Sequence, residues 1–289
     1  QQEYGEVRGS SYLQENFLCF IMQCPAQEYV RLQINTMDMI RMILTVVALS
    51  LAAACSPKQS EILVLTERGG QHGPFTDAAL EWLAEESVEN GYNITEINTA
   101  DPITREFLER FDAVIQLDYP PFGWTEEGQQ AFQEYIEEGK GGWIGFHHAT
   151  LIGEFREGYP IWEWFRELMG GITYRNYIAG LTDGTMVVED ETHPVMAGVS
   201  PTTIIPDDEF YIYDKSPRGK VRILASVDED SYTTETDIKM GDHPVVWTNE
   251  DVKGRNLYIQ MGHSPKLLEN PDFTQMLRNA IDWVLKNNR

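Results

Sequence analysis

Cysteine is scarce in this 289-residue sequence, and its three cysteines, Cys19, Cys24 and Cys55, all lie in the first fifth of the chain. The remainder therefore has no thiol nucleophile, no disulfide and no thiolate metal ligand. Basic residues are also few, with 22 Lys and Arg against 46 Asp and Glu, so the formal net charge is −24. This balance argues against nucleic acid as a partner and against attachment to anionic lipid through basic residues, because both need a basic face.

Long apolar runs are absent except near the front of the chain. Residues 42–54 form an apolar run of 13 residues after Arg41, which is too short to span a bilayer as a helix. It has the length of the hydrophobic region of a signal peptide and ends in small residues before Cys55. The segment resembles a bacterial lipoprotein signal, although Ala52 stands where leucine is usual. A buried core helix is the alternative interpretation.

These features predict the domain organisation. Residues 1–36 are expected to be an over-extended or disordered N-terminus, and residues 37–54 a signal peptide. Cys55 would carry the lipid, and residues 55–60 would form a tether. Residues 61–289 would form one α/β domain. The expected location is the cell envelope of a bacterium, periplasmic or surface-exposed, with the lipid anchor as the only contact with the membrane.

Hydrophobic patterning after the tether alternates between strands and helices. Short apolar runs predict strands at 61–66, 92–98, 112–117 and 142–146, separated by helices from Thr76 or Asp77 to 90, at 104–110 and at 125–138. Further strands are expected at 185–189, 221–225, 244–247 and 256–260, with helices at 162–169 and 272–285. Alternation of this kind is typical of βαβ units and a parallel sheet. The second half is less regular and predicts an antiparallel portion. The sequence contains no Gly-x-Gly-x-x-Gly, no Walker loop and no internal repeat.

Polar residues follow several of these predicted strands. In open parallel sheets, ligands bind outside the carboxyl ends of the strands. The residues found there are His72, Asp118, Tyr119, His147, His148 and His263. Gly145-Phe-His-His-Ala149 has the layout of a nucleophile elbow, whose central side chain, here His147, would stand exposed above the sheet. Histidine suits acid–base work or metal binding better than nucleophilic attack.

An acidic cluster supplies further candidates. Asp208 and Glu209 belong to a run of three acids that brings a carboxylate to the site, with a solvated acidic turn as the alternative. Arg218 is a candidate for binding an anion or a hydroxyl group. His193 and His243, which both precede proline, are interpreted as structural.

Several separated motifs resemble the ThuA-like, or trehalose utilisation, family. They are Gly139-Lys-Gly-Gly-Trp-Ile-Gly-Phe-His-His-Ala149, His193-Pro-Val-Met-Ala-Gly-Val199, Asp208-Glu-Phe-Tyr211 with Pro217-Arg218, and Gly262-His263 followed by Glu269-Asn-Pro-Asp-Phe273. The resemblance covers roughly residues 60–287. It implies a class I glutamine amidotransferase-like fold, a flavodoxin-like three-layer α/β sandwich, and a small-molecule carbohydrate as ligand. Glutaminase chemistry is excluded, because His147 stands where the amidotransferases carry cysteine.

Two functions remain open at this stage. The first is an enzyme, a hydrolase or lyase, acting on a disaccharide, a glycoside or its 3-keto form. His147, His263 and Glu209 would be its catalytic groups, and His72, Tyr119, His148, Asp208 and Arg218 would bind substrate. A divalent metal, with zinc as the expected ion, could instead be held by His72, His147 and His263. The second function is a non-catalytic sugar-binding lipoprotein.

Overall fold

A computed structural model of the chain describes residue 41 and residues 59–153, 160–178, 180–233 and 238–286. The predicted N-terminal segment, the signal peptide apart from Arg41, and Cys55 lie outside the described residues, so those predictions stay predictions. Ser60, placed in the predicted tether, is the first residue of strand β1. Among the described residues, no helix combines the length and apolar character needed to cross a membrane.

Nine strands of the described chain form one sheet in the order β2-β1-β3-β4-β11-β10-β9-β6-β7. They are β1 (Ser60–Thr66), β2 (Tyr92–Ile97), β3 (Ala113–Leu117), β4 (Gly142–Phe146), β6 (Thr182–Val188), β7 (Thr202–Asp208), β9 (Arg222–Asp228), β10 (Pro244–Thr248) and β11 (Asn256–Ile259). The five strands from β2 to β11 run parallel, and the other four pair antiparallel. The predicted fold class, a mainly parallel α/β sheet with an antiparallel portion in the second half, is confirmed.

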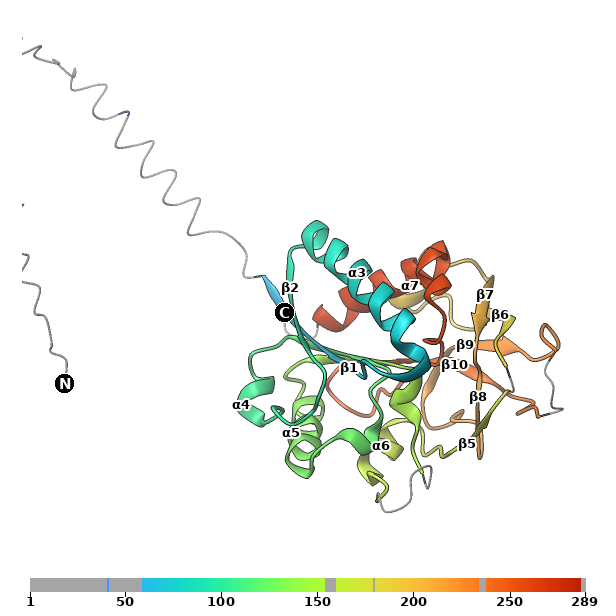
Figure 1. The fold of residues 1–289 in the computed structure, drawn as a ribbon, viewed down its shortest axis with the longest axis horizontal. Helices are drawn as coiled ribbons and strands as arrows, with labels where there is room; N and C mark the ends of the chain where they lie inside the picture. Colours follow the sequence, from blue (N-terminus) through green and yellow to red (C-terminus); the bar gives the residue numbers. More distant parts are fainter. Residues whose placement is uncertain (1–40, 42–58, 154–159, 179, 234–237, 287–289) are drawn as a thin grey trace, which may run out of the picture. The chain divides into compact units, whose positions relative to one another are not determined.

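Helices cover both faces of the parallel part (Figure 1). The described helices are α3 (Gly73–Asn90), α4 (Arg105–Leu108), α5 (Glu126–Glu137), α6 (Glu163–Leu168) and α7 (Pro271–Leu285), with 3-10 turns η1 (Gly70–His72), η2 (Pro121–Gly123), η3 (His147–Thr150), η4 (Pro194–Met196) and η5 (Pro265–Glu269). Helices α3 and α7 pack on one face, and α4, α5 and α6 pack on the other.

Strand β1 illustrates why both faces are covered. Its central residues are all buried, and successive side chains point to opposite faces of a strand. Ile62 and Val64 therefore join the core beneath α3 and α7, whereas Leu63 and Leu65 join the core beneath α4, α5 and α6. A continuous apolar run is the pattern expected of such a doubly covered strand.

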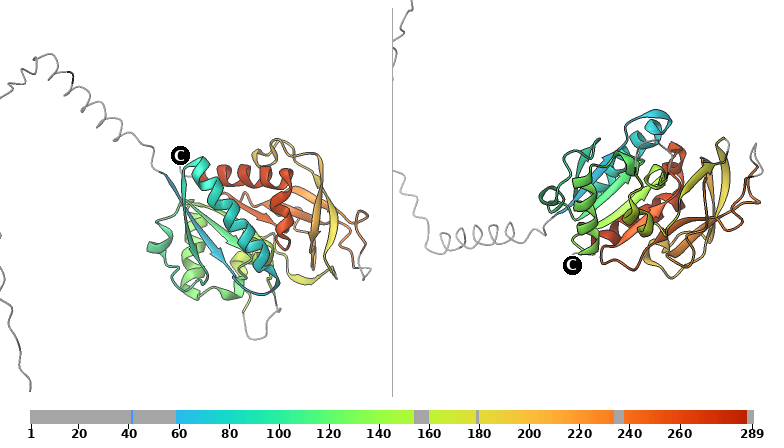
Figure 2. Two further views of the ribbon diagram at one scale, coloured as in Figure 1. Left: turned by 45° about the horizontal axis from the view of Figure 1, so that its top comes forward. Right: turned by 90° about the horizontal axis from the view of Figure 1, so that it is seen from below.

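The antiparallel strands extend the sheet beyond β11 (Figure 2). Strands β6, β9 and β10 confirm the predicted strands near residues 185, 221 and 244. Three strands were not predicted: β7, and the pair β5 (Tyr174–Tyr177) and β8 (Tyr211–Tyr213), which forms a separate two-stranded sheet. Their sequences are short or lack alternation, so their pairing depends on neighbours that are distant in the chain.

Helix α3 ends at Asn90 as predicted but starts earlier than expected. It begins at Gly73, directly after His72, rather than being capped by Thr76 or Asp77. Thr76 consequently lies inside the helix and is buried. Val88, expected on the inner face, is 85% exposed, and Trp82 and Glu86 are buried instead. The early start of α3 matters for the site, because it holds His72 against the end of β1.

Candidate functional site

Four histidines meet at the carboxyl edge of the parallel strands. His72 follows β1, His147 and His148 follow β4, and His263 follows β11. The ring of His72 is central, with its centroid 4.0 Å from that of His148, 4.5 Å from His263 and 4.9 Å from His147. Strand order explains the meeting, because β1, β3, β4 and β11 are consecutive parallel neighbours. We call these four residues the histidine cluster.

His147 occupies the elbow that the sequence predicts, but it is not exposed. Its φ angle of 42° lies in the left-handed region that non-glycine residues rarely adopt. Its side chain is fully buried, and its ring stacks on Tyr211 at a centroid distance of 4.2 Å. The expectation of an exposed central side chain is therefore wrong, because Tyr211 on β8 covers the elbow.

A close backbone approach also encloses His147. At Gly262, a Cβ atom would lie 2.8 Å from the Cβ of His147 and 3.0 Å from Oδ1 of Asp118. Only glycine allows the turn after β11 to pass so near the turns after β4 and β3. Asp118 has a φ angle of 55°, and neither of its buried carboxyl oxygens has a hydrogen-bond partner.

Hydrogen bonds fix the orientation of two imidazoles. The Nδ1 atom of His147 lies 2.9 Å from the carbonyl oxygen of Gln260 and donates to it, since a carbonyl only accepts. The Nε2 atom of His147 then carries the lone pair when the ring is neutral. His148 Nδ1 lies 2.6 Å from a carboxylate oxygen of Glu67, which follows β1.

Glu209 brings a carboxyl group to the cluster from the end of β7. Its Oε2 lies 3.4 Å from Nε2 of His147, and its side chain is 15% exposed. Nε2 of His147 nevertheless has no hydrogen-bond partner, and neither does Nε2 of His72. Glu209 is thus placed between the buried imidazoles and the surface, where it can exchange a proton with a ligand.

Burial sets the charge state of the cluster. It lowers the pKa of His72 to about 2, with the three neighbouring imidazoles adding to the effect. Burial likewise lowers the pKa of His147 well below its usual range and lowers that of His263. The same cause raises the pKa of Glu209. Neutral imidazoles expose lone pairs for a proton or a metal ion.

Asp208 is buried and has a positioning role. Its carboxyl oxygens accept hydrogen bonds from the backbone N–H of Glu209 at 2.7 Å and of Gly262 and His263 at 3.3 and 3.4 Å. Burial raises its pKa to about 7, against the opposing effect of these backbone donors. Asp208 thus fixes the turn that carries His263 rather than facing a ligand.

Two other predicted binding residues have their polar groups engaged elsewhere. The Tyr119 hydroxyl donates to the carbonyl of Gly123 at 2.9 Å and accepts from the N–H of Ala100 at 3.1 Å, which braces its own loop. Arg218 donates to both Glu189 and Asp242 at 2.8–2.9 Å. Neither residue contacts the histidine cluster among the interactions of the described chain.

His193 and His243 have the structural roles that were expected. The Nδ1 atom of His193 accepts from the N–H of Val195 at 3.3 Å and caps η4. The ring nitrogens of His243 lie 3.0 Å from a Glu229 carboxylate oxygen and 3.0 Å from the carbonyl of Tyr211. His243 thus braces Tyr211, whose ring covers His147.

Sequence reasoning missed three contributors to the site, Glu67, Tyr211 and Gln260, and it placed Asp118 at a strand end without giving it a role. Glu67 directly follows β1, so the rule that found the histidines could have found it. Tyr211 and Gln260 act through a ring stack and a carbonyl group across chain separations that no local pattern reveals.

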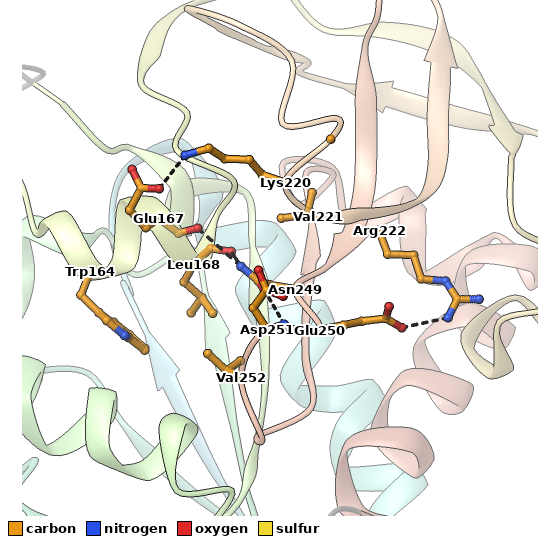
Figure 3. A pocket seen from close by; sticks show the side chains of 11 residues that line it. Trp164, Glu167, Leu168, Lys220, Val221, Arg222, Asn249, Glu250, Asp251 and Val252 are labelled. Atoms are coloured by element: carbon orange, nitrogen blue, oxygen red, sulfur yellow. Dashed lines mark hydrogen bonds and ion pairs between the residues drawn. The ribbon is translucent and has the colours of Figure 1, made fainter.

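A separate pocket of about 690 Å³ shares no residue with the cluster. Figure 3 shows two charged pairs in its lining. Lys220 lies 2.6 Å from Glu167, and Arg222 lies 2.9 Å from Glu250. Because these charges are already paired within the protein, the histidine cluster is the stronger candidate for chemistry.

Comparison with known proteins finds relatives of this chain. A family model described as ThuA, trehalose utilisation, matches residues 61–284. The chain is similar to a ThuA-like protein from Bacteroides uniformis, with 25% identity, a TM-score of 0.71, and coverage of 79% of this chain and 93% of the other. A ThuA-like protein from Parabacteroides merdae is 17% identical, with a TM-score of 0.59 and coverage of 79% of this chain and 90% of the other. A cytoplasmic protein from Salmonella typhimurium is 10% identical, with a TM-score of 0.53 and coverage of 78% of this chain and 98% of the other. This last likeness supports the fold alone. A search of curated proteins found no match.

Proposed function

This chain belongs to the ThuA (trehalose utilisation) family, and from that premise we propose that it is an enzyme cleaving a disaccharide, a glycoside or its 3-keto form at the histidine cluster. The family supports the carbohydrate-related role. The observation that carries the enzymatic proposal is the position of Glu209, partly exposed and 3.4 Å from the fully buried His147. A carboxyl group at the mouth of a desolvated site is the arrangement expected of a general acid or base.

Glu209 is the proton-transfer group in this proposal. Burial raises its pKa, which moves it toward the neutral range where it can both accept and release a proton. His263, whose ring contacts that of His72, assists as a hydrogen-bond donor. His147 is too deeply buried to reach a substrate C–H bond. Its role in this proposal is therefore to position the site rather than to take the substrate proton.

A 3-keto sugar suits such a site. The keto group acidifies the neighbouring C2–H bond. Glu209 takes the C2 proton, the C–H electron pair forms the C1=C2 double bond, and the C1–O bond breaks. The carboxyl group of Glu209 then passes this proton to the leaving oxygen, to which the neutral ring of His263 donates a hydrogen bond, and water then adds across the double bond. Each positioned acid or base contributes about 10²- to 10⁴-fold in rate.

Cysteine-based glutaminase chemistry is not part of the proposal. The elbow position holds His147, and the sequence has no cysteine after Cys55. The imidazoles that a substrate, or an ion that binds the substrate, can reach are those of His72 and His148, whose side chains are 11% and 15% exposed. These two were expected to bind substrate from the sequence.

The test is a turnover assay on trehalose, other disaccharides and their 3-keto forms, with products identified by mass spectrometry. We expect Glu209→Gln to lower kcat by about 10²- to 10⁴-fold on the substrate that is turned over. Glu81→Gln, at an exposed position on α3, is the matched control and should retain full activity. Turnover by Glu209→Gln equal to that of the unaltered protein would overturn the role of Glu209. Binding of a sugar without any chemical change would favour the sugar-binding lipoprotein.

A further inference from the structure

We propose that His72, His147 and His148 bind one divalent transition-metal ion, with zinc as the expected ion. One ring nitrogen from each of the three lies within 4.8 Å of the others. Zinc–nitrogen bonds are about 2.0–2.1 Å, so ligand nitrogens on one ion lie about 3–4 Å apart. Small rotations of the rings would therefore bring the three nitrogens onto a common ion.

Outer partners already point two of these rings inward. Metal-binding histidines usually donate their second N–H to a carbonyl or carboxylate, which fixes the tautomer and directs the lone pair at the ion. Nδ1 of His147 pairs with the Gln260 carbonyl at 2.9 Å, and Nδ1 of His148 pairs with the Glu67 carboxylate at 2.6 Å. In both cases the remaining Nε2 is the atom available to an ion.

One ring nitrogen of His72 and one of His147 have no hydrogen-bond partner. Nε2 of each is buried without a hydrogen-bond partner, although buried polar atoms are normally paired. The left-handed backbone at His147 is strained, because non-glycine residues rarely adopt it. In return, that turn presents His147 and His148 with near-parallel rings, 12° apart, toward His72. An ion would use both unpartnered atoms and account for the turn.

Negative charge around the cluster would balance a divalent ion. Glu67 contacts His148 and lies 3.9 Å from Nδ1 of His72. Asp118, beside His147 at Gly262, has two buried carboxyl oxygens without hydrogen-bond partners. A buried carboxyl group without a partner is unfavourable unless a positive charge lies nearby. With an ion bound, Asp118 would therefore act as a counter-charge rather than as a direct ligand.

A second group around His72 competes with this assignment. Ligand atoms of His72, Glu209 and His263 also lie within 4.8 Å of one another. We favour His147 and His148 because both have outer acceptors and because His147 carries an unpartnered buried nitrogen. His148 thus replaces His263 in the ligand set that the sequence suggested, and Glu209 remains free for proton transfer.

The ligand set indicates the class of ion. Three imidazoles with an open fourth position are typical of catalytic zinc, and imidazole also suits cobalt and nickel. The role of the ion rests on the proposed function: it would polarise a sugar carbonyl or hydroxyl beside Glu209. Ion binding itself is measured without any sugar, so the two proposals can fail separately.

The experiment uses the full chain produced without a histidine tag. It is stripped with chelator and titrated with Zn²⁺, and binding is followed by calorimetry and by metal content after gel filtration. We expect one equivalent of zinc per chain and a rise in Tm that chelator reverses. Co²⁺ should give the visible absorption of a nitrogen-ligated, low-coordinate ion.

Variants then identify the ligands. Loss of an outer partner weakens metal binding by about 10- to 100-fold, so His72→Gln and His148→Gln should each weaken zinc binding by at least about 100-fold. Glu209→Gln and His263→Gln should keep the zinc. His193→Asn, which retains a capping side chain outside the cluster, is the control for loss of an imidazole and should also keep it. Circular dichroism checks that each variant is folded.

The inference is overturned if the stripped, folded protein takes up no Zn²⁺ or Co²⁺. It is also overturned if Glu209→Gln and His263→Gln lose the ion while His148→Gln retains it, since the second group would then be the site. Zinc binding without any sugar turnover would overturn the proposed function and support the metal site. Sugar turnover by protein that binds no metal would overturn the metal site and support the proposed function.

Discussion

Among the single residues that shape the site, Gly262 shows how little room there is for a side chain between its turns. A side chain there would meet the Cβ of His147 at 2.8 Å and Oδ1 of Asp118 at 3.0 Å. Neither neighbour can move away easily, because His147 is buried in a strained turn and Asp118 is fully buried. The spacing between the turns after β3, β4 and β11 is thus set by the absence of one methyl group.

We therefore predict that Gly262→Ala destabilises the protein by about 1–3 kcal/mol, the usual effect of overpacking. Urea unfolding measures the change. Gly73→Ala is the control, because its Cβ meets nothing within 4 Å and its backbone is helical, so it should be neutral or slightly stabilising. Equal stability of the Gly262→Ala and unaltered proteins would contradict the tight packing described for this turn.

Arg218 is a residue whose contacts suggest a structural role. It joins Glu189 at the end of β6 to Asp242 before β10 through four hydrogen bonds. These hydrogen bonds lower the pKa of both carboxyl groups. Carboxyl groups with a lowered pKa stabilise the fold above their unfolded pKa of about 4, and this contribution is lost as the pH falls further.

We predict that Arg218→Met lowers the free energy of unfolding by about 1 kcal/mol at pH 7, since the pairs are partly exposed and screened. The difference from the unaltered protein should shrink as the pH falls below about 4, because the carboxylates become protonated. Urea unfolding at pH 7 and pH 3 tests this. Lys239→Met, which breaks a single exposed pair with Asp230, should have a smaller effect. Unchanged stability at pH 7 together with reduced sugar turnover would restore the substrate-binding role expected from the sequence.

Helix starts illustrate how elements depend on their surroundings. Helix α5 begins as predicted: the Thr125 side chain caps it by accepting from the N–H of Gly128 at 3.0 Å. Helix α3 begins three residues before Thr76, so that hydroxyl is buried inside the helix without a hydrogen-bond partner. Threonine therefore stabilises α5 as its N-cap but destabilises α3, where its buried hydroxyl has no hydrogen-bond partner.

This contrast predicts opposite effects of one substitution. Thr76→Val keeps the shape and removes an unsatisfied hydroxyl, so it should stabilise the protein by about 1 kcal/mol. Thr125→Val removes a cap and should destabilise it by about 1 kcal/mol. Thermal and urea unfolding of the two variants give the signs directly. A shift in the same direction for both would show that the helix start assigned to α3 is wrong.

At the scale of the whole molecule, the location of the protein depends on the segment before the domain. The apolar run of residues 42–54 and Cys55 predict a cleaved signal and a lipid anchor. We propose that the mature protein begins at Cys55 and is held at the cell envelope by that lipid. The acidic composition of the chain argues against attachment to anionic lipid through basic residues.

We predict that the native protein partitions with membranes and carries lipid on Cys55, whereas Cys55→Ser is unlipidated and separates from them. Labelling with a fatty acid and mass spectrometry of the N-terminal peptide provide the measurement. The substitution lies outside the α/β domain, so the thermal unfolding of the domain should be unchanged. Recovery of any peptide from residues 1–36 in the native protein would refute the predicted start.

Much of the architecture was predictable, because strands with buried centres and capped helices leave local patterns. The four parallel strands before residue 150, α5 and α7 lie within a few residues of their predicted positions. The four histidines could be grouped because each follows a strand, and parallel strands end at one edge. Strands β5, β7 and β8 were missed, since their pairing is with distant segments.

The sequence by itself determined the α/β class and the convergence of histidines at the strand ends, because both follow from the periodicity of its hydrophobic residues. It also determined the absence of thiol chemistry after Cys55, because this follows from composition. Only the tertiary structure decided that His147 is buried rather than exposed, that Gln260 and Glu67 orient two imidazoles, and that Arg218 is held by two carboxylates. Burial and hydrogen bonding join residues far apart in the chain, and no local pattern encodes which partners will meet.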